Sequence, residues 1–195
     1  SDTQNHRVLW WNGISSLQNG KVADGALGQA NLNGSCINRG DPEGDCTANT
    51  LYTPRGIFVD NDYVWVCDTL NNRVLGYPLA TLATGMDATR VLGQADFISN
   101  GINRGSQPNT ASAGTLSSPY AVTEDASGNL WVADYWSSRV LRYDIAAYTD
   151  GMDANRVIGQ TTMSGKSPNH NPGNNNFVVQ NSLQYPTGVV CIEND

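Results

Sequence analysis

Short apolar segments alternate with polar, turn-forming segments along the chain. One pair of apolar runs, "GIFVD" (56–60) and "VWVCD" (64–68), is rich in β-branched and aromatic residues, and the "NDY" between them is typical of a hairpin turn. Two further runs follow at 73–79 and 89–95, after segments that contain Gly or Asn. The pattern predicts four antiparallel strands. Because the runs are almost continuously apolar, we expect both faces of this small sheet to be covered.

The same order of segments repeats with a period of about 66 residues. An eleven-residue phrase marks the repeat most clearly and occurs as "SDTQNHRVLWW" (1–11), "CDTLNNRVLGY" (67–77) and "ADYWSSRVLRY" (133–143). A fixed period indicates that each repeat is one supersecondary unit, which buries its apolar face against its neighbour. Four-stranded sheets arranged radially in this way form a β-propeller.

Two stretches of the sequence resemble NHL repeats, a β-propeller family named for Asn-His-Leu. They are "PRGIFVDNDYVWVCDTLNNRVLGY" (54–77) and "PYAVTEDASGNLWVADYWSSRVLRY" (119–143), and the family pattern runs P-x-G-apolar-D-G-x-apolar-x-V-A-D-x-x-N-N-R-V. The units are longer than the usual NHL blade, which is similar to the long-blade NHL proteins of bacteria. The resemblance implies an all-β propeller fold. It implies little about activity, because propellers host many functions.

The repeats describe one propeller segment that covers residues 1–195. Its parts are the outer strands of a first blade and a long loop (1–53), a second blade and its loop (54–118), a third blade and its loop (119–185), and the first strand of a further blade (186–195). This amounts to about three units of four-stranded antiparallel blades, half of a six-bladed ring. Closed propellers have about four to eight blades, so we expect the chain not to close by itself.

An open stack of blades leaves an apolar flank at each end, and patches of that kind on a protein surface mark interfaces. We therefore expect the partner to be a second copy of the chain, in a homodimer with two-fold symmetry that approximates a six-bladed ring. The N-terminal outer strands of one copy would then stand next to the C-terminal first strand of the other.

Composition and charge narrow the classes of partner. Charged residues make up 15% of the chain, Gly, Asn, Ser and Thr are plentiful, and the formal net charge is −7. This composition predicts a secreted or periplasmic protein. Basic residues are scattered singly, which disfavours nucleic-acid binding because phosphates need a basic patch. No polybasic or amphipathic helical stretch is present, so we also expect no attachment to a membrane.

The four cysteines fall into two kinds. Cys36 and Cys46 bracket a polar loop, which predicts a disulfide and hence an oxidising compartment; the alternative is two free surface thiols. Cys67 and Cys191 lie in apolar runs, where we expect them to act as small buried hydrophobes.

An acidic and a basic residue flank the turn of each repeated phrase. The pairs are Asp68 with Arg73 and Asp134 with Arg139. We interpret each pair as a turn brace, in which the carboxylate accepts backbone hydrogen bonds and the guanidinium pairs with it. An active site needs unlike groups that converge once, whereas these pairs recur in every unit.

The sequence gives no sign of a catalytic or metal centre. His6 takes the place of Asn72 in the turn and His170 lies in a loop, so the two histidines have no zinc-ligand spacing. The family includes lyases that hold a metal with histidines on the propeller axis, but the first strands here contain no histidine. The acidic segments 38–45 and 60–63 lack the spacing of a calcium loop. We therefore expect no catalytic residue, no metal and no cofactor.

The remaining function that the sequence supports is recognition of a ligand through the loops. In an antiparallel four-stranded sheet, alternate connections emerge at the same end, so the second-to-third strand turns and the long loops between units share one face. Candidate ligand contacts are Tyr135 and Trp136 in such a turn and Asn103 and Arg104 in a long loop. The alternatives are that Trp136 folds over the adjacent loop and that the repeated "INRG" motif packs against a neighbouring unit.

The sequence thus favours a non-enzymatic scaffold that binds a protein, peptide or glycan ligand. The competing hypothesis is a segment of a propeller enzyme, a lyase or hydrolase, whose catalytic residues lie on blades outside this chain.

Overall fold

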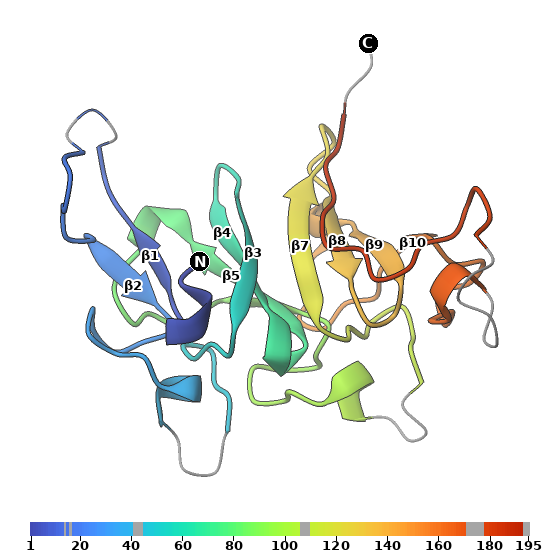
Figure 1. Cartoon of the computed structure of the whole chain (residues 1–195), viewed down its shortest axis with the longest axis horizontal. Helices are drawn as coiled ribbons and strands as arrows, with labels where there is room; N and C mark the ends of the chain where they lie inside the picture. Colours follow the sequence, from blue (N-terminus) through green and yellow to red (C-terminus); the bar gives the residue numbers. More distant parts are fainter. Residues whose placement is uncertain (14, 16, 41–44, 106–109, 171–177, 193–195) are drawn as a thin grey trace.

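The computed structural model describes residues 1–195 apart from 14, 16, 41–44, 106–109, 171–177 and 193–195. The described part is all-β, with ten strands in antiparallel sheets of two, four and four strands (Figure 1). The helical elements between these strands are single 3₁₀ turns of three or four residues. None of the helices in this part has the length and apolar character needed to cross a bilayer.

The two complete sheets have the same strand order. One runs β3-β4-β5-β6 and consists of β3 (Pro54–Val59), β4 (Tyr63–Asp68), β5 (Arg73–Pro78) and β6 (Arg90–Leu92). The other runs β7-β8-β9-β10 and consists of β7 (Pro119–Glu124), β8 (Leu130–Asp134), β9 (Arg139–Tyr143) and β10 (Arg156–Ile158). The four antiparallel strands predicted from the apolar runs are confirmed in both. The third sheet pairs only β1 (Val8–Trp10) with β2 (Gly25–Leu27).

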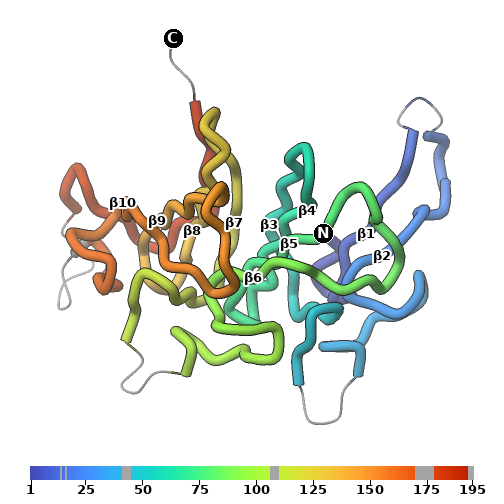
Figure 2. The backbone as a smooth tube through the Cα atoms, turned by 180° about the vertical axis from the view of Figure 1, so that it is seen from behind, coloured from blue at the N-terminus to red at the C-terminus, as the bar shows by residue number. Residues whose placement is uncertain are grey.

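The connections contain the 3₁₀ turns. Turns η1 (Thr3–Asn5) and η4 (Thr69–Asn71) lie at the start of the third strands β1 and β5, and η3 (Ile37–Gly40), η6 (Ile102–Gly105) and η8 (Pro168–His170) lie in the long loops between units. Turns η5 (Leu79–Thr81) and η7 (Ile145–Ala147) follow the third strands β5 and β9. Figure 2 shows the connection after η5 passing close to β2, where the Gly85 amide donates to the Ala26 carbonyl.

Each four-stranded sheet is covered on both faces where a neighbouring sheet is present. Strand β4 shows this through side-chain alternation. Trp65 and Cys67 pack in the apolar cluster shared with β7–β10, whereas Val64 and Val66 pack in the cluster shared with β1 and β2. Cys67 is therefore a buried hydrophobe, and burial raises the pKa of its thiol.

The first strands of the two complete sheets pack directly against each other. The contact is so close that a Cβ atom at Gly56 would lie 2.6 Å from the Tyr120 carbonyl oxygen. Only glycine fits this position without moving backbone, which explains the glycine in "PRG". The close approach fixes the spacing between neighbouring sheets along β3 and β7.

The C-terminal segment differs from the prediction of a first strand at 186–195. Residues 186–192 pair with no strand of the described part, and 193–195 lie outside it. A strand forms only beside a hydrogen-bonded neighbour, and the neighbour of a first strand is a second strand. Val190 and Ile192 consequently leave 74% and 77% of their surface exposed, and Cys191 is only partly buried, so its predicted role as a core residue is wrong.

The predicted turn braces are ion pairs at the turn that joins the second and third strands of each complete unit. Arg73 Nε lies 2.7 Å from Asp68 Oδ2, and both side chains are fully buried. Asp68 Oδ1 also accepts the Tyr52 amide at 2.6 Å. Arg139 and Asp134 repeat this geometry at 2.7 Å with both side chains fully buried.

The guanidinium of each brace also binds the loops on either side of its turn. Arg73 donates to the Phe97 carbonyl from one terminal nitrogen and to the Thr47 and Thr50 carbonyls, at 2.9 and 3.0 Å, from the other. Arg139 donates likewise to the Met163 and Thr115 carbonyls. One side chain thus joins the loop that precedes the unit to the loop that follows it.

A buried glutamine repeats beside each brace. Gln29, Gln94 and Gln160 each donate from Nε2 to two carbonyls, one at the end of the brace turn and one in the next long loop. For Gln94 these are the carbonyls of Asn72 and Gly101, at 3.0 and 2.8 Å. The repeated Gly-Gln landmark of the sequence is therefore a second tie between turn and loop.

Replacing either buried arginine with alanine should destabilise the protein strongly, because the variant leaves a buried carboxylate and several loop carbonyls without their donor. We expect Arg73→Ala and Arg139→Ala each to lower the free energy of unfolding by about 3 kcal/mol or more. Arg7→Ala is the matched control, since the Arg7–Asp2 pair is partly exposed (17% and 31%) and should cost about 1 kcal/mol. Urea denaturation measures all three, and equal losses would contradict the bracing role.

His6 should make stability depend on pH. Its Nδ1 accepts the Thr53 amide at 3.1 Å, as Asn72 Oδ1 accepts the Ser118 amide at 2.9 Å in the next unit. Burial lowers the pKa of His6 below its ordinary 6.5, so the unfolded chain binds this proton more readily than the folded one. The free energy of unfolding should therefore fall as the pH drops through about 6.5. Denaturation at neutral and mildly acidic pH should show a smaller fall for His6→Asn than for the wild type; identical falls would contradict this role.

Candidate binding site

The turns after the second strands and the long loops meet on one face of the molecule. The Leu70 amide donates to the Tyr52 carbonyl and the Trp136 amide to the Ser117 carbonyl, each at 3.1 Å. The Asn103 amide donates to the Leu116 carbonyl at 3.0 Å, which draws η6 into the same face. This face is the lower side of both views (Figures 1 and 2). Any ligand bound there would contact turns and loops that the braces hold at their base.

The "INRG" motif has a structural role in both of its copies. Asn38 and Asn103 are buried and adopt left-handed backbone conformations, with φ of 44° and 49°. Arg39 and Arg104 donate to the carbonyls of Gly85 and Gly151, in the connections that reach back from the following unit. Arg104 is thus occupied within the chain, which favours the interpretation that this motif packs against a neighbouring unit.

Tyr135 is also held within the chain. Its ring stacks between Tyr120, at a centroid distance of 4.3 Å, and Tyr185, at 5.2 Å. Thr3 and Thr69 occupy the same turn position in the other units, where their hydroxyls donate to the Pro54 and Pro119 carbonyls. Tyr135 therefore replaces a hydrogen bond to the following first strand with aromatic stacking.

Trp136 touches the end of the adjacent long loop at Tyr185 but is not covered by that loop. Its indole contacts Tyr135 and Tyr185 edge-on, at centroid distances of 5.1 and 5.3 Å, and the residue remains 55% exposed. An exposed indole held by two other rings is a rigid apolar platform, because its side chain loses little further freedom when a ligand binds.

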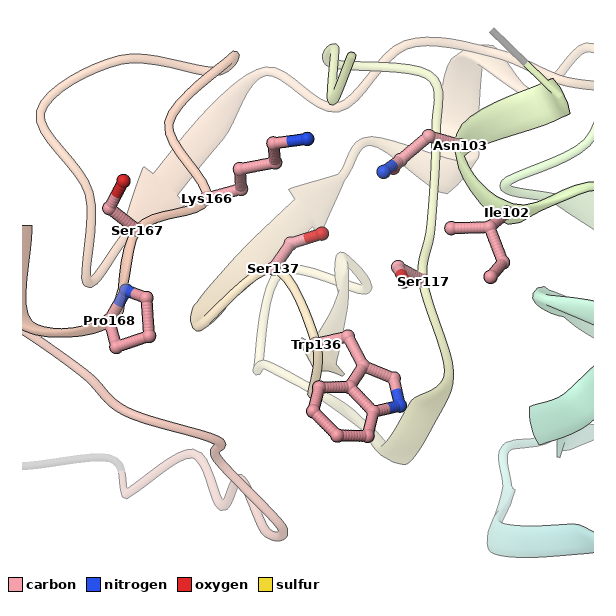
Figure 3. A pocket seen from close by; sticks show the side chains of 8 residues that line it. All are labelled: Ile102, Asn103, Ser117, Trp136, Ser137, Lys166, Ser167 and Pro168. Atoms are coloured by element: carbon pink, nitrogen blue, oxygen red, sulfur yellow. The ribbon is translucent and has the colours of Figure 1, made fainter. Parts of the chain in front are cut away.

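A pocket of about 430 Å³ lies beside Trp136 (Figure 3). The residues that line it come from three segments of the loop face: Ile102, Asn103, Ser117, Trp136, Ser137, Lys166, Ser167 and Pro168. The side chains of Lys166 and Asn103 reach toward each other across the pocket, and the indole of Trp136 closes another side. The lining combines hydroxyl, amide and ammonium groups with one aromatic surface, as ligand pockets do.

Comparison of the two complete units shows why the pocket exists. Leu70, Asn71 and Tyr52 stand in one unit where Trp136, Ser137 and Ser117 stand in the next. The two serines are much smaller than the asparagine and tyrosine that they replace. In the preceding unit the Asn71 carboxamide reaches across to Asn38, whereas the Tyr52 ring lies against His6.

Electrostatics around the pocket are set by the brace beneath it. Complete burial raises the pKa of Asp134, and contacts with Arg139, the Ser117 amide and Ser137 oppose this rise. Arg139 neutralises the carboxylate of Asp134 beneath the pocket. Among the residues that line the pocket, Lys166 is the one with a cationic side chain.

An acidic depression lies at the opposite ends of the strands. Asp60, Asp62 and Glu124 line it, and burial together with the neighbouring carboxylates of Asp60, Asp125 and Asp62 raises the pKa of Glu124. Within the described ranges, no group of three or more His, Cys, Asp or Glu side chains converges as metal ligands would. The other acidic segment, 38–45, has its central residues 41–44 outside the described part.

The predicted disulfide between Cys36 and Cys46 is not formed in the structure, where both thiols are free. Cys46 is buried, and its Sγ lies 3.4 Å from the Ser99 carbonyl oxygen in the next long loop. Cys36 is exposed beside η3. The Cys46 thiol thus packs toward the following unit, which sequence spacing alone does not indicate.

No family model matches the chain, and no curated protein matches it significantly.

Proposed function

We propose that the chain is a segment of an NHL-type β-propeller and works as a non-enzymatic scaffold that binds a protein, peptide or glycan on its loop face. Two observations support the propeller arrangement: both complete sheets have the same strand order, and their first strands, β3 and β7, pack side by side. In a propeller the first strands line the axis, so neighbours meet there. Composition, together with the resemblance to bacterial long-blade proteins, supports a secreted or periplasmic location.

The pocket beside Trp136 is the observation that carries the binding role. Binding energy concentrates on large aromatic side chains next to well-formed pockets, with surrounding polar groups that select the ligand. Trp136 provides the aromatic surface, and Asn103, Lys166 and the serines provide the polar groups. The feature belongs to one unit, whereas the braces recur, and a site that differs between units is what specific recognition requires.

The test is binding of immobilised glycans and peptides to the purified chain and to Trp136→Ala. We expect Trp136→Ala to bind the selected ligand about ten-fold more weakly or worse, because the variant removes the aromatic surface without touching the buried core. Trp11→Ala is the matched control, since Trp11 is 41% exposed but lies in the N-terminal unit. Equal binding by Trp136→Ala and the wild type would overturn the proposed site.

We also propose that two copies of the chain associate. The described strands leave one edge of β1 without a partner apart from the Asp2–Arg7 bridge, and an apolar hollow of about 250 Å³ lies between β1 and β3. Trp10, Ile57 and Val59 are among the residues that line it. The exposed segment 186–192 supplies the complementary apolar surface. In the dimer, segment 186–192 of one copy adds as a strand beside the open edge of β1 in the other copy. A two-fold arrangement lets both copies make this contact and closes the assembly.

Light scattering at micromolar concentration tests this association. We expect twice the monomer mass for the wild type and the monomer mass for Val190→Asp, because a charge on residue 190 opposes burial of the exposed segment. Thr187→Asp is the control, since Thr187 is exposed and polar already. A monomer mass for the wild type at all concentrations would exclude the dimer, and an open-ended mass distribution would indicate head-to-tail filaments instead.

A further inference from the structure

Two residues that depart from the repeat meet at the pocket beside Trp136. Lys166 directly precedes the residue whose carbonyl accepts the buried glutamine, and the corresponding residues of the other units are Ser35 and Asn100. Trp136 stands where the other turns have glutamine or leucine. Both side chains line the same pocket (Figure 3). This unit therefore gains a cation and an indole in one place.

Part of the pocket lining is not open to a ligand. Asn103, Ser117 and Ser137 are all buried. Asn103 Oδ1 also accepts a hydrogen bond from the Thr115 hydroxyl at 3.0 Å. These residues shape the pocket but offer a ligand little surface.

The accessible part of the lining is one cation among apolar groups. Lys166 is exposed, and Trp136 and Ile102 leave 55% and 47% of their surface exposed. Pro168 adds a further apolar surface, and Ser167 adds a hydroxyl. The Lys166 side chain extends into the pocket, and the Trp136 ring lies on another side of it (Figure 3). A ligand that matches this surface carries a negative charge beside an apolar group.

The electrostatics of the pocket favour an anion at Lys166. An ammonium group has three N–H donors, so Lys166 can bind a carboxylate while it keeps a contact within the chain. Among the described residues that line the pocket, none is an aspartate or a glutamate. The carboxylate of Asp134 is neutralised by Arg139. A hydrogen bond between ammonium and carboxylate is therefore unopposed there, and partial exclusion of water strengthens it.

The C-terminal residue of a peptide combines the two groups that the pocket requires. Its carboxylate and its side chain leave the same Cα in different directions, as Lys166 and Trp136 lie on different sides of the pocket. The carboxylate of an internal acidic residue is itself the end of the side chain, so nothing apolar remains to cover Trp136. Capture of a C-terminal carboxylate is a recurring mode of peptide recognition.

We infer that this pocket binds the C-terminal residue of a partner peptide, with its carboxylate at Lys166 and its apolar side chain against Trp136 and Ile102. The inference deepens the proposed binding function and rests on it. The pocket volume of about 430 Å³ lies toward the lower end of the usual range for ligand sites, which suits a terminal residue better than a long segment.

Isothermal calorimetry with a matched pair of peptides tests the carboxylate contact. The probes are acetyl-Gly-Ser-Gly-Phe with a free carboxylate and the same peptide as its C-terminal amide. We expect the amide to bind about ten-fold more weakly, because it keeps the side chain and loses the charge. Lys166→Met should lower the affinity for the free acid by about the same factor and leave the affinity for the amide unchanged. Lys166→Arg should retain binding of the acid within about three-fold.

The two lysines of the chain allow a direct readout of the contact. Reductive methylation with carbon-13 formaldehyde keeps the charge of each ammonium and labels Lys21 and Lys166 for NMR, and Lys21→Arg identifies the two signals. The signal of Lys166 should shift on addition of the free acid and not on addition of the amide. Lys21→Gln is the matched control, since Lys21 pairs with Asp24 in the N-terminal unit, and its affinity for the acid should equal that of the wild type.

Each contrary outcome has a defined meaning. Equal affinity for acid and amide, or unchanged binding of the acid by Lys166→Met, would overturn the carboxylate contact. Tighter binding of a peptide with an internal glutamate and an amidated end would overturn the assignment to a C-terminus. If neither probe binds but a ligand selected from glycans or peptides still depends on Trp136, this inference fails while the proposed scaffold function stands.

Discussion

A buried guanidinium in each complete unit is the interaction on which the rest of the structure depends. Arg73 neutralises a fully buried carboxylate and donates to backbone carbonyls in the loop before its unit and in the loop after it. Burying such a pair is costly unless every donor and acceptor is used, and here the loop carbonyls use them. Long loops, which are normally mobile, are therefore anchored at both ends. Without this anchor the loop face would have no fixed shape to offer a ligand.

Sequence pattern predicted the regular part of the fold because the information there is local or periodic. Apolar runs of strand length and a fixed period specify four-stranded units that cover one another. Two features depend on non-local geometry and were missed. Residues 186–192 have the composition of a strand, but pairing needs a neighbour, and the described part provides none. Cys36 and Cys46 are close in sequence, yet the Cys46 thiol packs toward the carbonyl of Ser99.

The site was predictable only where a residue departs from the repeat. Trp136 could be found because an aromatic residue stands where other copies have leucine or glutamine. Tyr135 departs from the repeat as well, but its ring fills the gap between two tyrosines whose proximity the sequence does not reveal. Asn103 and Arg104 belong to a repeated motif, and their repetition already indicated a packing role. The sequence signal at the pocket was a pair of small residues, Ser117 and Ser137, in positions where the preceding unit has Tyr52 and Asn71.

A repeat protein can create a binding site by replacing a large side chain with a small one in a single unit, without changing the backbone around it. In a closed core, replacing asparagine with serine would leave a cavity and cost stability. At Ser137 the smaller side chain lines the pocket beside Trp136 instead. The brace beneath is unchanged, because Arg139 makes the same ion pair as Arg73. The loops therefore stay in place when the side chain between them is smaller, and the pocket beside Trp136 keeps its shape.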